Sequence, residues 1–136
     1  MKMIITSAIL VLFSCLSTKK SIKNQDFPSG NYLVLSLEDK TFSEKDKYII
    51  NIDTNQKRLG GKLDCNTFGT NYTLKDDNSI EFGYAMSTKM YCEGKMEIEN
   101  RFFKKLNSMK FYKFEDDYLS FYDDSNSLIL KLKRIN

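Results

Sequence analysis

The chain has no histidine and no tryptophan, only one proline, and three cysteines among its 136 residues. Without histidine it cannot form a Ser-His-Asp or Cys-His catalytic pair, and it lacks the commonest side-chain ligand of transition metals. Three cysteines alone do not complete an ordinary structural zinc site, which has four ligands. The formal net charge of +3 is too small to favour nucleic acid as a partner. We therefore expect a protein without catalytic residues, metal or cofactor.

The start of the chain has the pattern of a signal peptide. Lys2 precedes an uncharged run, Met3–Phe13, which is too short to span a bilayer as a helix. The run ends in Leu12-Phe13-Ser14-Cys15, which resembles the bacterial lipoprotein signal, where a cysteine after a small residue is lipidated and becomes the new N-terminus. We therefore predict a signal peptide over 1–14 and acylation of Cys15, for example by palmitate. An uncleaved membrane anchor, or a secretory signal with an incidental cysteine, is the alternative.

The residues after Cys15 predict a tether and then one domain. Residues 15–30 are rich in Ser, Thr, Lys and Asn and contain the only proline, Pro28, as expected of a flexible linker. The length of the remaining part, 31–136, favours a single domain. No aspartate directly follows Cys15, since the next residue is Leu16. By resemblance to bacterial sorting rules, this predicts an outer membrane location, lipid-anchored and facing the periplasm.

Alternation of apolar and polar residues predicts short antiparallel strands through most of the domain. Asp- and Asn-rich segments between the apolar runs predict tight turns. We therefore expect a mainly β fold: a small, barrel-like, curled antiparallel sheet of about eight strands. The clearest alternating runs are Leu33–Leu37, Tyr48–Asp53, Ile80–Met86, Tyr118–Tyr122 and Leu128–Lys133, with Ile80, Phe82, Tyr84 and Met86 on one face of their strand.

Two segments depart from simple alternation. Gly60-Gly61, inside a strand-like run, predicts a bulge or a sharp bend. Lys95–Asn107 has the composition and apolar spacing of one amphipathic helix laid on the sheet or plugging it. Glu99 falls inside the apolar arc of this helix, where a carboxylate needs hydrogen bonds or a counter-charge. It is interpreted either as a structural residue that ties the helix to backbone N–H groups or to a tyrosine, or as a ligand-contacting carboxylate in a pocket.

With Cys15 assigned to lipid, Cys65 and Cys92 remain, 27 residues apart. An even pair in an exported protein favours a disulfide. Closing a loop of this length would stabilise the fold by roughly 3.5 kcal/mol on the chain-entropy estimate. Two buried free thiols are the alternative, because sequence alone does not show whether the two side chains meet.

The surroundings of these cysteines resemble the META/HslJ domain family. Gly60–Phe68 is similar to the family's Cys-Asn segment, with Asn71-Tyr72 as the tyrosine that follows, and Ser87–Cys92 is similar to its Thr-x-Met-x-Cys segment. Glu99 with Phe103 and Leu106 matches the helix pattern, and the last two apolar runs match the closing hairpin. The resemblance covers about residues 27–134.

The resemblance implies a mostly antiparallel, barrel-like domain with one helix, found in envelope lipoproteins or secreted proteins and linked to stress and antibiotic resistance, with no established enzymatic activity. Its motif residues Asn66 and Thr88 are best explained as turn and loop formers. Asp64 stands where the family usually has Gly, which puts in doubt any loop conformation that needs glycine at this position.

Two further patterns were weighed for binding. Asp53, Asn55 and Asp64 mimic ligand positions of a calcium loop, but Arg58 occupies the position that requires glycine, so no calcium site is expected. A hairpin near the C-terminus is rich in aromatic residues, and rings that its strands leave exposed would form a contact surface. The candidate surface residues are Tyr112, Phe114, Tyr118 and Tyr122.

The sequence thus favours a non-enzymatic envelope lipoprotein, held at the membrane by its lipid anchor and monomeric in other respects. It would bind a protein or another envelope component through the loops around Cys65 and Cys92 together with the aromatic hairpin. The alternative is a carrier of a lipid or small apolar ligand in the barrel interior. A hydrolase is least favoured, since no nucleophile–base pair is visible.

Overall fold

The structure, a computed structural model, describes residues 26–135 and arranges their strands in antiparallel order β6-β5-β4-β3-β1-β10-β9-β8. Two short strands lie off this path, because β2 pairs with β1 and β7 pairs with β5. The bounds are β1 Gly30–Leu37, β2 Lys40–Thr41, β3 Ile49–Asp53, β4 Arg58–Leu63, β5 Asn66–Leu74, β6 Ile80–Phe82, β7 Met86–Ser87, β8 Phe111–Glu115, β9 Tyr118–Tyr122 and β10 Leu128–Ile135, with one helix, α1, at Glu97–Leu106.

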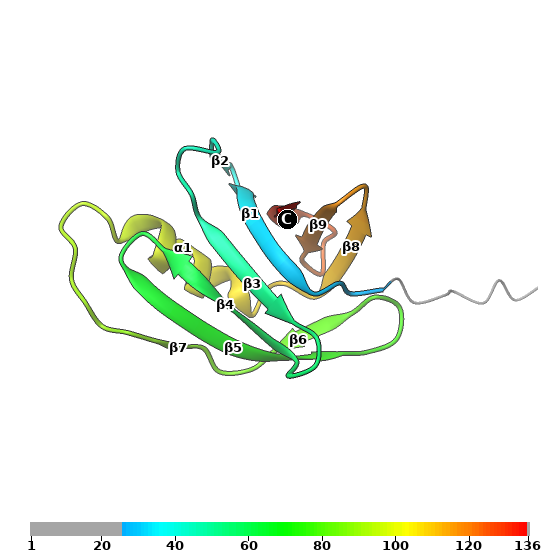
Figure 1. Ribbon diagram of the computed structural model, residues 1–136. Helices are drawn as coiled ribbons and strands as arrows, with labels where there is room; N and C mark the ends of the chain where they lie inside the picture. Colours follow the sequence, from blue (N-terminus) through cyan, green and yellow to red (C-terminus); the bar gives the residue numbers. More distant parts are fainter. Residues whose placement is uncertain (1–25, 136) are drawn as a thin grey trace, which may run out of the picture.

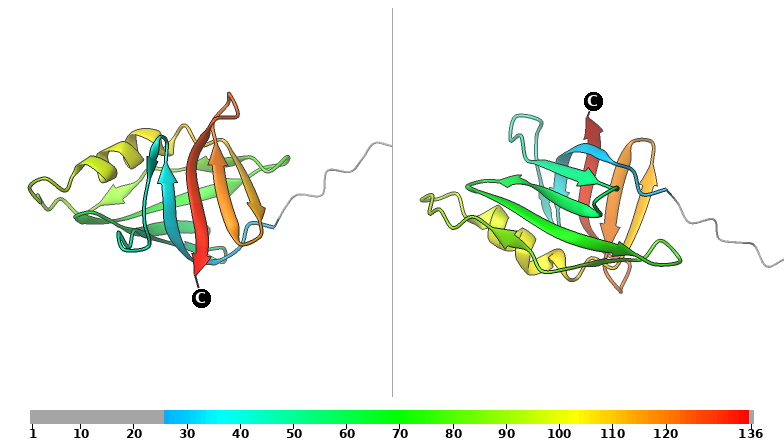
Figure 2. Two further views of the ribbon diagram at one scale, coloured as in Figure 1. Left: turned by 90° about the horizontal axis from the view of Figure 1, so that it is seen from above. Right: turned by 60° about the horizontal axis from the view of Figure 1, so that its bottom comes forward.

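The sheet curls until its two ends, β6 and β8, nearly meet (Figures 1 and 2). An isolated bridge joins Ser79 to Phe111 between them. The N–H of Ile80 donates to the carbonyl of Lys110 at 2.8 Å, and the N–H of Tyr112 donates to the carbonyl of Asn78 at 2.9 Å. The predicted fold, a barrel-like antiparallel sheet of about eight strands with one helix, is confirmed.

Acidic and amide residues form the turns, as their sequence positions predict. Asp116 and Asp117, between β8 and β9, both have positive φ angles, of 50° and 65°, which short polar side chains tolerate and two-residue hairpins require. Between β3 and β4, the carboxylate of Asp53 accepts hydrogen bonds from the N–H groups of Asn55 and Gln56. Local side-chain chemistry therefore fixes where each strand ends.

The inward faces of the strands and one face of α1 fill the interior of the barrel with apolar side chains. The alternation that predicted the strands places these side chains inside, since every second residue of a strand faces the same way. Among the largest fully buried side chains are Tyr32, Ile50, Ile52, Leu59, Phe102, Leu119, Phe121, Leu130 and Leu132. This filling argues against the alternative function, because a carrier needs interior space for its ligand.

The folded part of the chain begins earlier than residue 31. Phe27 is buried, and its ring packs edge-on against Tyr72 and Tyr112 at centroid distances of 5.0 and 4.8 Å. The hydroxyl of Tyr32 donates to the carbonyl of Pro28 at 2.9 Å. The end of the predicted tether is therefore part of the fold. Burial of the Phe27 ring removes apolar surface from water, which lowers the free energy of the folded state. The predicted signal peptide and Cys15 lie outside the described residues.

The glycine pair forms no bulge, which was one of the two alternatives that the sequence predicts, the other being a sharp bend. Strand β4 pairs with β3 and β5 in unbroken register through Gly60 and Gly61. A Cβ atom at Gly61 would lie 2.3 Å from the carbonyl oxygen of Ile49, and one at Gly60 would lie 2.8 Å from that of Phe68. The glycines are needed because neighbouring backbones approach closely where the sheet curls. The register shifts lie elsewhere, in β1 and β10.

The strand predicted over Ile80–Met86 is also shorter than expected. Strand β6 ends at Phe82, and the next residues leave the core face, so that Tyr84 is 95% exposed. Met86 pairs instead with Gly69 in the short strand β7, with its side chain exposed. Of the four residues predicted to lie on one face of this strand, only Ile80 and Phe82 are buried, because the strand ends before Gly83.

Replacing Gly61 by alanine should destabilise the fold by about 1–3 kcal/mol, because the new methyl group meets fixed backbone on β3. Gly83→Ala is the matched control: its Cβ would lie 3.5 Å from the nearest atom, the carbonyl oxygen of Asn71, an ordinary contact. Denaturant unfolding measures both variants. Equal stability of the two variants would contradict the close-approach explanation.

Candidate functional site

Helix α1 packs one apolar face on the sheet and carries a carboxylate on that face. Phe102 and Leu106 are buried, and the ring of Phe102 lies 4.8 Å from that of Phe68 on β5. Glu99 is 4% exposed on the same face, as the helical spacing of the sequence predicts. A charge at this depth requires partners, which the structure supplies from the first residue of β5.

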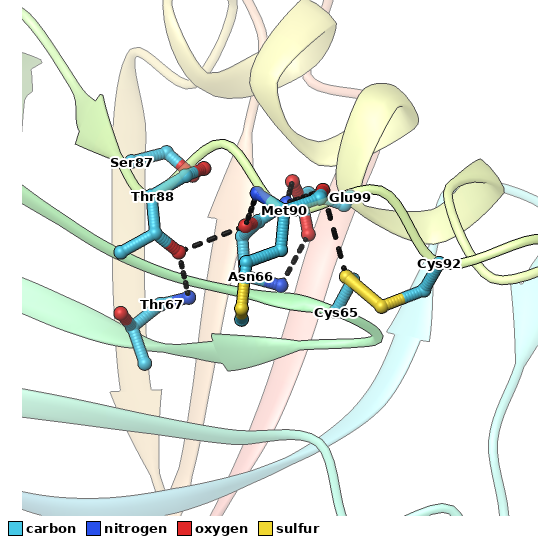
Figure 3. Close-up of a disulfide and its surroundings, with 8 residues drawn as sticks. All are labelled: Cys65, Asn66, Thr67, Ser87, Thr88, Met90, Cys92 and Glu99. Carbon is cyan, nitrogen blue, oxygen red and sulfur yellow. Dashed lines mark hydrogen bonds between the residues drawn. A yellow bond between two sulfur atoms is a disulfide. The ribbon is translucent and has the colours of Figure 1, made fainter.

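Asn66 is the partner of Glu99 (Figure 3). Its backbone N–H donates to one carboxylate oxygen of Glu99 at 2.9 Å, and its side-chain Nδ2 donates to the other at 2.8 Å. Both residues are buried, so these charge-assisted bonds replace water around the carboxylate. Of the two interpretations of Glu99, the geometry favours the structural one, because both of its oxygens are engaged within the chain.

The same asparagine also holds the loop before the helix. Its Oδ1 accepts hydrogen bonds from the hydroxyl of Thr88 at 2.8 Å and from the N–H of Met90 at 2.7 Å. Its Nδ2 donates a further bond to the carbonyl of Met90 at 3.1 Å. The hydroxyl of Thr88 accepts in turn from the N–H of Thr67. One amide side chain therefore links β5, the loop and α1.

A disulfide joins the same two segments. Cys65 and Cys92 are bonded, with their Cα atoms 5.8 Å apart (Figure 3). The bond lies next to Asn66, so the covalent link and the hydrogen-bonded network fix the same loop. The sequence left open whether the two cysteines meet, because that depends on how the sheet and the loop fold together.

Asp64 is a site residue that sequence reasoning missed. It adopts a positive φ of 41°, and its carboxylate accepts from the hydroxyl of Tyr48 at 2.7 Å and from the N–H of Ile98 at 3.2 Å. It thus caps α1 from a distance, since the residue at the cap position, Met96, provides no side-chain cap. Burial, and then the bond to Asp64, raise the pKa of Tyr48 to about 12. The start of the helix lacks Ser, Thr, Asp and Asn, but nothing near it in the sequence identifies Asp64 as the residue that caps it.

Ion pairs hold the opposite side of α1 to the turn between β1 and β2. Arg101 pairs with Asp39 at 2.6 Å, and Lys105 pairs with Glu38 at 2.7 Å. Lys40 pairs with Glu97 in the first turn of the helix. These pairs are partly exposed and add modest stability. The face of the helix that carries Glu99 is held instead by the hydrogen bonds of Asn66.

The aromatic hairpin differs from the contact surface predicted from the sequence. Tyr112 is only 4% exposed and belongs to the core, and Phe114 is partly buried against that core. Tyr118 is at the limit of exposure and Tyr122 is half-buried. In β8 the inward face carries Tyr112, because the strand register turns Phe111 outward instead. Four aromatic residues in sequence therefore do not form one exposed patch.

A different segment concentrates exposed apolar side chains. Tyr84, Met86, Met90 and Tyr91 are all exposed, with Tyr91 at 81%. These four residues are named the 84–91 rim. Three of them, Tyr84, Met86 and Met90, line a hollow of about 660 Å³ between the loop and α1. Its other lining residues include Asn66, Thr88, Met96, Glu99 and Phe103. The hollow therefore lies directly over the buried network.

The reactive groups beside this hollow are engaged within the chain. Each carboxylate oxygen of Glu99 accepts a hydrogen bond from Asn66, and the sulfur atoms of Cys65 and Cys92 are joined to each other. Over residues 26–135, no three Asp, Glu or Cys side chains come together in a way that suits a metal ion. In the same range, no helix has the length and apolar character needed to cross a membrane.

Glu99→Gln should destabilise the protein by about 2–3 kcal/mol, because the new amide group faces a buried N–H donor of Asn66 and leaves it without an acceptor. Glu97→Gln, in the same helical turn but exposed, is the matched control and should destabilise the protein much less. Chemical denaturation of the two variants gives the comparison. A larger loss for Glu97→Gln would refute the role assigned to Glu99.

The geometry can now be compared with known proteins. The profile of the META domain matches residues 25–134. The structure is similar to one from Burkholderia xenovorans, determined by NMR, with 18% identity, a TM-score of 0.64, and coverage of 79% of this chain and 83% of that one. It is also similar to the crystal structure of a DUF4847 family protein from Bacteroides vulgatus, with 13% identity, a TM-score of 0.58, and coverage of 77% and 92%.

Identities this low establish a shared fold and no shared function. Among curated proteins, none matches the chain. The family profile, in contrast, spans nearly all of the described residues and includes the Cys-Asn segment, the second cysteine and the helix with Glu99. The chain therefore belongs to the META domain family.

Proposed function

We propose that this protein is a non-enzymatic binding module of the bacterial envelope, which contacts a partner protein through the 84–91 rim. The observation that carries the proposal is the concentration of exposed apolar side chains in this one short segment beside a hollow. Exposed large apolar groups gathered in one place are typical of interaction sites. The stress-related role expected from the family resemblance stays a prediction.

The backbone under the rim is fixed, which suits a binding surface. Thr88 and Met90 are hydrogen-bonded to Asn66, and Cys92 is bonded to Cys65. The side chains of Tyr84 and Tyr91 are therefore presented on a loop that loses little conformational entropy when a partner binds. Methionine is flexible and polarisable, so Met86 and Met90 suit an apolar partner of irregular shape.

The position of the rim relative to the N-terminal end supports a partner away from the membrane. Phe27 packs against Tyr72 near the end of β5, whereas Asn66, beside the disulfide, begins the same strand. Six residues of extended strand separate these points by about 20 Å. The described chain therefore enters at one end of the barrel, and the part of the rim with Met90 and Tyr91, next to the disulfide, lies toward the other. Met86 lies between the two ends, because it pairs with Gly69 in the middle of β5. A lipid anchor upstream of Phe27 would leave Met90 and Tyr91 facing the periplasm.

The proposed lipid anchor at Cys15 predicts a specific mass. The mature protein purified from cells should begin at Cys15 and carry acyl chains, and each buried methylene contributes about 0.8 kcal/mol to anchoring. Intact-mass spectrometry and membrane fractionation test this. The Cys15→Ala form should lack the added mass and leave the membrane fraction. A mature protein that starts elsewhere, or carries no lipid, would refute the anchor while leaving the rim untouched.

A photoreactive residue in place of Tyr91 should form a covalent adduct with one defined partner protein in intact cells. The ring at this position is 81% exposed, so the substitution should leave the fold intact. The same substitution at Tyr118, on the aromatic hairpin, tests the other surface expected from the sequence. We expect the adduct from Tyr91 and none of that mass from Tyr118.

The companion variant Tyr84→Ser/Met86→Ser removes apolar surface from the rim without touching the network around Asn66. It should greatly reduce the adduct formed from position 91, while the thermal unfolding midpoint stays unchanged. Adducts of equal yield from positions 91 and 118, or adducts that survive the double substitution, would contradict the proposed binding surface.

A further inference from the structure

A second hollow lies on the other side of β7, on the outer face of the sheet. Its volume is about 340 Å³, and β4, β5 and β7 line it with Arg58, Thr67, Phe68, Gly69, Met86, Ser87 and Thr88. It shares Met86, Ser87 and Thr88 with the hollow under the 84–91 rim. Strand β7 therefore separates the hollow that the apolar side chains of the 84–91 rim border from a second hollow, whose lining includes a cation and no carboxylate.

The cation is Arg58, which lies against a glycine. A Cβ atom at Gly69 would be 2.8 Å from one terminal guanidinium nitrogen of Arg58 and 3.1 Å from its Nε. Any residue other than glycine at position 69 would therefore displace the guanidinium of Arg58 from this place. The residue directly opposite Arg58 on β5 is Asn71, so the side chain leans along the strand, over Gly69 and toward Thr67.

The guanidinium has no anionic partner among the described residues. No ion pair and no side-chain hydrogen bond within residues 26–135 involves it, although Asp53 is its cross-strand neighbour on β3. The carboxylate of Asp53 instead accepts from the N–H groups of Asn55 and Gln56 in the adjoining turn. One carboxylate oxygen of Asp53 is thus committed to the turn, and no acceptor among residues 26–135 engages the side-chain donors of Arg58.

One hydroxyl in the hollow is similarly uncommitted. The hydroxyl of Thr88 donates to Asn66, and that of Ser87 donates to the carbonyl of Thr88. The side chain of Thr67, in contrast, is exposed and makes no hydrogen bond within the described part of the chain. Arg58 and Thr67 therefore both offer hydrogen-bond donors to one hollow, whose lining also includes Gly69. This combination suits an oxyanion, and the planar guanidinium suits a carboxylate in particular.

We propose that Arg58, with Thr67, binds a carboxylate of the partner, carried by an extended peptide segment that crosses β7 and places apolar residues against the 84–91 rim. This inference rests on the proposed function and adds the chemistry of the partner: an acidic residue flanked by apolar ones. Charge complementarity carries it, since the lining holds a cation without an acid. The shared residue Met86 makes the apolar and anionic contacts adjacent.

The test uses the full chain, kept unacylated by Cys15→Ala, and two blocked peptides, Val-Leu-Asp-Leu-Val and Val-Leu-Asn-Leu-Val. NMR titration follows the backbone amides of Thr67, Gly69 and Ser87 and the Nε–H of Arg58. We expect the Asp peptide to shift these signals and to bind about tenfold more tightly than its Asn counterpart. Arg58→Gln should abolish that difference, and Arg58→Lys should retain part of it.

Controls separate this inference from the proposed function. Lys45→Gln removes one exposed positive charge from the turn between β2 and β3 and should leave both affinities unchanged. Equal affinity of the two peptides, or an Asp preference that survives Arg58→Gln, would overturn the carboxylate site, and so would the absence of any shift at millimolar peptide. Inorganic phosphate that competes as well as the Asp peptide would show a site for any anion and overturn the peptide assignment. The cross-linking from Tyr91 decides the proposed function independently, because it does not involve Arg58.

Discussion

The buried pair of Asn66 and Glu99 is the interaction on which the rest of the site depends. A primary amide side chain both donates and accepts, so Asn66 satisfies the carboxylate of the helix and the backbone of the loop at Met90 at the same time. Aspartate has the same length but cannot donate from its ionised side chain, and a hydrophobic residue would leave Glu99 without partners. A helix with no local cap and a loop with little regular structure are therefore placed by one side chain and by the disulfide beside it.

Much of this arrangement follows from local patterns in the sequence. Alternation identified most strands, the helical spacing of apolar residues placed Glu99 on the packed face, and the Asp-rich segments marked the turns. The failures share a cause, which is that they concern contacts between distant segments. The register of β8 decides that Tyr112 is buried, and Asp64 caps a helix more than thirty residues away. Neither has a signature within a short window of sequence.

The same division explains why the proposed binding surface was only half visible in the sequence. The loops around the two cysteines were expected to form a surface, but Tyr84 and Met86 were assigned to a core strand because they continue its alternation. The chain after Gly83 cannot stay on the core face, since only the short strand β7 pairs there with β5. Apolar residues that a strand pattern would bury are exposed instead, and the network beneath Thr88 holds them in place. Within this one segment, the hydrogen bonds of Thr88 stabilise the loop, and the side chains of Tyr84 and Met86 provide the exposed apolar surface.

The burial of Phe27 has a mechanical consequence. The strand that follows it, β1, is hydrogen-bonded to β3 on one side and to β10 on the other, so it is central rather than peripheral in the sheet. Tension applied through the chain that precedes Phe27 must first withdraw this ring from Tyr72 and Tyr112, and then slide β1 past two ladders at once. The hydrogen bonds of both ladders are then loaded together in shear, rather than broken one after another from one end. The disulfide, at the other end of β5, ties the loop that carries Met90 and Tyr91 covalently to the start of that strand, so this loop stays attached when the barrel is pulled.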